Sequence, residues 1–185
     1  MANKIKFGLS KAYYSVITYS GGSETYGTPV ALPGAVNLSM AADSEDNPFY
    51  ADNIIYFESD SNNGYSGTLE LALIPDSFRK DVLGETEGTN NIVSEYANVE
   101  GKEFALLFQF EGDDKATAHA LYRVKASRPD VASQTKEAGI TPVTETLNLK
   151  AMPRISDHLV RGKCPQGGSA YSSWFSAVQL PTFSS

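Results

Sequence analysis

FALLFQFEGDDKATAHALYRVKA, residues 104–126, is the stretch of sequence that decides the fold. Its first part, residues 104–110, is almost entirely apolar, which is typical of a central strand with both faces covered. Residues 111–115 are polar and include a glycine, so they predict a tight turn. Residues 116–126 then alternate, with Tyr122 and Val124 on one face and His119 on the other. The stretch therefore predicts a β-hairpin within an antiparallel sheet.

Shorter alternating runs on both sides of this hairpin predict further strands, because turn residues separate them. They occupy residues 11–20, 36–40, 54–57, 65–74, 143–151 and 174–180. The segment from Pro75 to Gly84 has apolar residues at helical spacing between a proline and a glycine, and it predicts one short helix over about residues 75–83. We therefore predict a single, mainly β domain over residues 1–185.

Three segments predict loops that are long for a compact domain. They are residues 41–52, 85–91 and 161–173. Ala41–Asp52 is acidic and contains the apolar pair Phe49–Tyr50, which suggests a chain that contacts neighbouring molecules. Asn63–Gly64 predicts a hairpin turn, because both residue types tolerate positive φ angles.

Composition excludes several classes of protein. The chain has 22 acidic and 15 basic residues, a net charge of -7, and no basic stripe of the kind that grips nucleic acid. It has no apolar run long enough to span a membrane, and its first residues lack the apolar stretch of a signal peptide, so we expect synthesis in the cytoplasm. Cys164 is the only cysteine, which excludes an internal disulfide.

Residue types that carry chemistry are few. The two histidines, His119 and His158, are not spaced as metal ligands, and His119 is expected to be a surface residue. Cys164 is expected to be a free cysteine in a loop, because a catalytic thiol needs a histidine beside it in space. These patterns predict no enzyme activity and no catalytic residue.

Two acidic segments raise the question of a cation site. Asp60 begins a stretch that resembles a calcium loop, but the sixth and twelfth places hold Tyr65 and Leu71 where glycine and glutamate are needed. The cluster of Asp43, Glu45 and Asp46 is interpreted as a solvated acidic loop. We therefore expect no metal and no cofactor.

Five motifs occur in order along the first half of the chain. They are FGL at 7–9, YGTP at 26–29, PGAVNLS at 33–39, PFYADNIIYF at 48–57, and NNGYSGTLELALIP at 62–75 followed by Phe78–Arg79. This ordered series resembles the major tail protein family of siphoviruses that infect Gram-positive bacteria. The resemblance runs through most of the chain and is densest from Phe7 to Gly84.

The resemblance implies a structural protein of the virion, with a β-sandwich or β-barrel fold and one flanking helix. Such subunits close into rings, usually hexameric, that stack around a tape-measure protein to form the tail tube, and tail terminator and adaptor proteins are further expected partners. The N-terminal arm (about residues 1–10) and the loop 41–52 are the candidate assembly elements. The candidate subunit-interface residues are Phe7, Asp43, Glu45, Asp46, Phe49 and Tyr50.

The net charge bears on how DNA would pass through such a tube. Duplex DNA carries about one negative charge per 1.7 Å of its axis, so a basic wall would hold it along its whole length. A neutral or acidic wall lets DNA slide without specific binding. We therefore expect a predominantly acidic lumen.

Two other readings of the sequence compete with a tail tube protein. Aromatic residues make up 11% of the chain, and such side chains also form sugar-stacking surfaces. The alternative prediction is therefore a recognition module with a β-sandwich fold, either from a phage baseplate or for carbohydrate binding. A small β-fold hydrolase is the third reading, but it requires converging catalytic groups that the sequence does not indicate.

Overall fold

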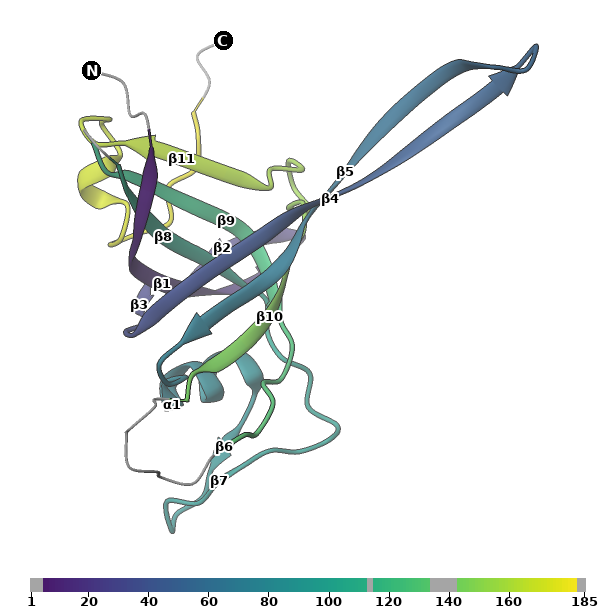
Figure 1. Cartoon of the computed structure of the whole chain (residues 1–185). Helices are drawn as coiled ribbons and strands as arrows, with labels where there is room; N and C mark the ends of the chain where they lie inside the picture. The colour runs from purple at the N-terminus through teal and green to yellow at the C-terminus, as the bar shows by residue number, and fades with distance from the viewer. Residues whose placement is uncertain (1–4, 113–114, 134–142, 183–185) are drawn as a thin grey trace, which may run out of the picture.

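The computed structural model describes residues 5–112, 115–133 and 143–182, except for the side chains of residues 46, 47, 59 and 60. One large antiparallel sheet dominates this part of the chain (Figure 1). Its strands are β1 (Lys6–Ser20), β2 (Ser23–Tyr26), β3 (Val30–Ala31), β4 (Ala35–Ala51), β5 (Ile54–Leu71), β8 (Phe104–Gly112), β9 (Thr117–Ala126), β10 (Glu145–Ala151) and β11 (Arg161–Pro165). A separate small hairpin consists of β6 (Thr86–Glu87) and β7 (Val93–Ser94).

The strands of the large sheet follow the order β2-β1-β8-β9-β10-β5-β4, with β11 added to β9 and β3 to β1. The sheet curls so that β1 and β4, which lie near its opposite ends, contact each other. The predicted central hairpin is confirmed as β8 and β9, which pair from Phe104 opposite Val124 to Phe110 opposite Thr117. The mainly β fold with one short helix is likewise confirmed.

The concave side of the curled sheet encloses the main hydrophobic core. Leu106 on β8 and Leu121 on β9 are buried there together with Leu69 on β5. The helical segment closes one end of this core, because Phe78 packs edge-on against Tyr14 and Phe104.

The opposite side of the central hairpin is covered by the C-terminal segment. Trp174 and its neighbours pack on Leu107 and Tyr122, which are completely or almost completely buried. The Trp174 indole N–H donates to the His119 carbonyl oxygen (3.2 Å), and the Tyr122 hydroxyl donates to the Gln179 carbonyl oxygen (2.8 Å). The prediction of a strand over residues 174–180 is therefore wrong. This segment has an irregular backbone, and these hydrogen bonds attach it to β9 as a cover rather than as a paired strand.

The predicted helix is confirmed as α1 (Asp76–Phe78) continued by one wider, π-helical turn, η1 (Arg79–Leu83). It ends at Gly84, whose φ of 80° suits glycine, and the Gly84 N–H donates to the Arg79 carbonyl oxygen. Arg79 also binds Glu145 on β10 (2.8 Å), which fixes the helix to the sheet. Among the described residues, no helix has the length and apolar character needed to cross a membrane.

Candidate assembly surface

A long hairpin projects from the body of the protein where a loop was predicted (Figure 1). Residues 41–51 belong to β4 and pair with β5 up to Ala51 opposite Ile54. Asp52 and Asn53 form the two-residue turn, with φ angles of 53° and 64°. Two consecutive positive φ angles are what a type I′ hairpin turn requires. The predicted loop over 41–52 is therefore wrong, because backbone pairing with β5 holds residues 41–51 in an extended ribbon.

The predicted hairpin turn at Asn63–Gly64 is also wrong, because both residues lie inside β5. β5 pairs with β10 only over residues 65–71, so this part is fixed on both sides within the sheet. From residue 64 back to the turn at residues 52–53, the ribbon consists of β4 and β5 alone. We call residues 43–62 the distal hairpin. A two-stranded ribbon is marginally stable in water by itself, which makes the distal hairpin a candidate for contact with another molecule.

The end of the distal hairpin exposes a concentration of large apolar side chains. This tip, residues 49–57, includes six of them with exposed fractions between 51% and 71%: Phe49, Tyr50, Ile54, Ile55, Tyr56 and Phe57. Phe49 lies opposite Phe57 and Tyr50 opposite Ile55, so Tyr56 is the extra residue of a β-bulge. An exposed apolar group of this size at the end of a projecting strand pair is typical of an interaction site.

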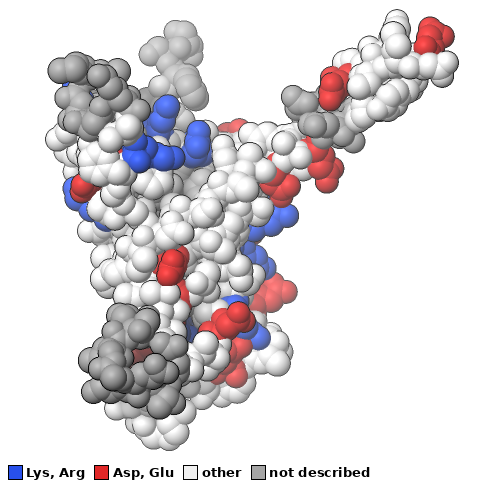
Figure 2. Space-filling model, viewed as in Figure 1, with Lys and Arg blue, Asp and Glu red and all other residues white. Residues whose placement is uncertain are grey.

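The distal hairpin also carries most of the net charge of the protein. It contains six acidic residues and no lysine or arginine, while the rest of the chain has 16 acidic against 15 basic residues. The acidic residues are Asp43, Glu45, Asp46, Asp52, Glu58 and Asp60. Figure 2 shows red side chains along the projecting hairpin. Most of the net charge of -7 therefore lies on the distal hairpin, and the rest of the chain is nearly neutral.

Most of the predicted interface residues lie on this hairpin. Asp43 stands at its base and forms a weak ion pair with Lys150 on β10 (3.7 Å). The Glu45 backbone is hydrogen-bonded to Ser61 across the ribbon, and its side chain is exposed. Phe49 and Tyr50 lie at the tip; Asp46 is in β4, and its side chain is outside the described set.

Phe7 lies apart from the other predicted interface residues. It belongs to β1, opposite Glu111 on β8, and is about half exposed. The predicted N-terminal arm over about residues 1–10 is therefore wrong from Lys6 onward, because backbone pairing with β8 holds this segment in the sheet. Residues 1–4 of the predicted arm lie outside the described residues.

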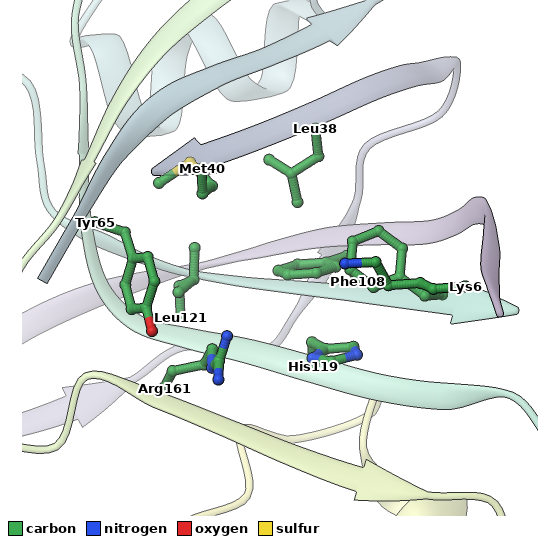
Figure 3. Close-up of a pocket in the computed structure, with 9 residues that line it drawn as sticks. Lys6, Leu38, Met40, Tyr65, Phe108, His119, Leu121 and Arg161 are labelled. Carbon is green, nitrogen blue, oxygen red and sulfur yellow. The ribbon is translucent and has the colours of Figure 1, made fainter. Parts of the chain in front are cut away.

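A basic pocket opens on the body between β4 and the β8–β9 hairpin (Figure 3). Its apolar wall includes Leu38 and Met40 from β4 and Phe108 from β8, and its volume is about 150 Å³. Lys6 and Arg161 stand at its rim, where their charged groups lie 4.9 Å from the Phe110 ring and 5.4 Å from the Tyr65 ring. The pocket thus combines an apolar interior with a cationic rim.

His119 forms one wall of the basic pocket and is half-buried, so the prediction that it is a surface residue is confirmed only in part. Its ring stacks on Phe108 (5.3 Å between centroids) and meets the Phe110 ring edge-on (5.0 Å). Burial lowers the pKa of His119 to about 4, and the cationic groups of Arg161, Lys6 and Lys163 add to this effect. His119 is therefore neutral at neutral pH, and the charge at the pocket rim comes from lysine and arginine.

The structure also places Cys164, the other residue that the sequence analysis considered for chemistry. Cys164 is buried in β11, so its predicted place in a loop is wrong: residues 161–165 pair with β9 from Arg161 opposite Leu121 to Pro165 opposite Thr117. Within the described residues, no three His, Cys, Asp or Glu side chains gather as a metal site would require.

No protein-family model and no curated protein sequence matches this chain. The two features that follow from its own geometry are the acidic, apolar distal hairpin and the basic pocket. The sequence indicated the first through Phe49–Tyr50 and the acidic cluster. It gave no sign of the second, whose lining residues come from strands far apart in the chain.

Proposed function

We propose that this protein is a structural virion protein, a major tail protein that assembles with copies of itself into the tube of a long-tailed phage. The observation that carries the proposal is the distal hairpin, which places six large apolar side chains far from the core. The ordered motifs between Phe7 and Gly84 support the assignment to phage tails.

Self-association is supported by the cost of leaving the tip in water. Burying apolar surface contributes roughly 25 cal/mol per Å², and strand edges offer unpaired backbone groups to a neighbour. A second copy of the chain can cover the apolar tip and can pair with the exposed strand edges. If the contact joins two different patches, repeated rotation closes a ring or continues as a filament. Hexameric rings stacked around a tape-measure protein, with terminator and adaptor proteins at the ends, are the arrangement implied by the resemblance.

Passage of DNA through the tube depends on which surface faces the lumen. The body carries nearly balanced charge, whereas the distal hairpin carries six carboxylates. An acidic lumen therefore requires the distal hairpin, or acidic residues separated from basic ones on the body, to line the channel. In either case repulsion between DNA and the wall is screened beyond about 10 Å at 0.1 M salt, so DNA slides freely.

Electron microscopy of the purified full chain at high concentration tests the proposal. Rings or tubes of uniform diameter are expected. Particles that remain monomeric at every concentration and bind glycans on an array would instead support a recognition module, with the tip aromatics as the sugar-stacking surface. That outcome would overturn the proposal.

A further inference from the structure

The distal hairpin and the basic pocket are complementary in charge and in apolar character. The distal hairpin carries six acidic and no basic residues. The pocket and the adjoining hollow are lined by Lys6, Arg161 and Lys163, with Glu111 as the only carboxylate among their described lining residues. Blue side chains gather over the upper body, around β11 and the start of β1, in the view of Figure 2.

The size of the basic pocket suits one aromatic side chain. A dry cavity of about 150 Å³ accommodates a benzene ring in other proteins, and the volume here is about 150 Å³. The ring of His119, held neutral between Phe108 and Phe110, offers a flat surface for stacking. The cations at the rim can also attract the face of an incoming ring or a carboxylate beside it.

The same chain cannot fill its own pocket with its tip. β4 lines the pocket through Leu38 and Met40 and then leaves the body as the distal hairpin, which points away from it (Figure 1). At about 3.3 Å per residue, the ribbon from Asp43 to Ala51 carries its end roughly 26 Å outward. This reach places the tip against another molecule.

From these observations we propose that the hairpin tip of one copy docks in the basic pocket of the next copy, with one tip aromatic side chain in the pocket and the hairpin carboxylates beside Lys6 and Arg161. The inference rests on the proposed function, because it specifies the contact through which copies assemble. The contact joins two different patches, so it propagates from copy to copy.

Two variants that each remove one half of the contact provide the test. The tip variant carries Phe49→Ser, Tyr56→Ser and Phe57→Ser, and the pocket variant carries Lys6→Glu and Arg161→Glu. All five side chains are exposed, so the fold is expected to persist in both, as thermal unfolding will report. A control with Lys102→Glu and Lys125→Glu makes the same change in net charge at exposed lysines that do not line the pocket.

Particle mass is measured by sedimentation velocity for each variant and for their equimolar mixture. Each variant alone is expected to stop at a small particle, with self-association weakened at least ~10-fold relative to the control. The mixture is expected to give a particle of twice that mass and no larger, because the tip variant keeps its pocket and the pocket variant keeps its tip.

Two outcomes would overturn the inference in distinguishable ways. If the wild-type chain assembles and the pocket variant assembles equally well, the pocket is not the docking site, while the proposed function stands. If the wild-type chain never assembles, the inference and the proposed function fail together.

Discussion

Replacing Phe49 and Phe57 with serine is expected to weaken self-association without lowering the stability of the fold. Each residue is 61% exposed. A phenylalanine offers roughly 200 Å² for burial, so about 120 Å² of each remains in contact with water. If a neighbour covers half of that area, burial at about 25 cal/mol per Å² contributes about 1.5 kcal/mol per residue. Loss of about 3 kcal/mol for the pair corresponds to a roughly 100-fold rise in the dissociation constant.

Concentration-dependent light scattering gives the association, and urea denaturation gives the free energy of unfolding. The free energy of unfolding is expected to change by less than about 0.5 kcal/mol, because the two rings lie outside both core clusters. Leu73→Ser with Ile92→Ser, which removes exposed apolar surface elsewhere, serves as the matched control. Unchanged association in the double variant, or equal weakening in the control, would refute the role of the tip.

Three further predictions concern stability. Glu24 is fully enclosed beside Arg154 (2.8 Å between Oε2 and Nε), so Glu24→Gln is expected to cost about 3 kcal/mol in urea denaturation; a loss below about 1 kcal/mol would contradict this. A Cβ on Gly67 would collide with a backbone carbonyl oxygen of β4, so Gly67→Ala should cost about 2 kcal/mol, whereas Gly27→Ala, with room for a Cβ, should cost less. Burial lowers the pKa of His119 from 6.5 to about 4, so between pH 6.5 and 4 the imidazole takes up a proton in the unfolded chain but not in the folded one. Stability should therefore fall by at most about 3 kcal/mol from pH 6.5 to 4 in urea titrations, and His119→Gln should flatten that slope, while an unchanged slope would count against it.

The central hairpin was predictable because its burial leaves a clear pattern in the sequence. Residues 104–110 are apolar on both faces, since one face meets the main core and the other meets the C-terminal cover. The helix from Asp76 was equally clear, because proline and Gly84 bound it. In both cases local chemistry and tertiary packing favour the same structure.

The distal hairpin was predicted only in part, because residues 54–57 were expected to form a strand but residues 41–52 a loop. None of the described side chains of residues 43–51 is buried, so no alternation of polar and apolar residues marks this part of the hairpin as a strand. Asn63–Gly64 and Asp52–Asn53 both suit a type I′ turn. The first is excluded because β5 pairs with β4 on both sides of it, at Asn62 and at Tyr65. The basic pocket was likewise invisible, because strands far apart in the sequence pair to bring Lys6, His119 and Arg161 together. The curvature of the sheet then brings Leu38 and Met40 of β4 to the same pocket.

Hydroxyl-radical footprinting at low and high protein concentration tests most directly whether the distal hairpin mediates assembly. Tyr50 and Tyr56 at the tip are 63% and 71% exposed, and Tyr96, at 54%, provides an internal reference on the body. The two tip tyrosines are expected to lose most of their reactivity as particles form, while Tyr96 changes far less. Tip tyrosines that stay as reactive in the assembled particle as in the monomer would contradict the account.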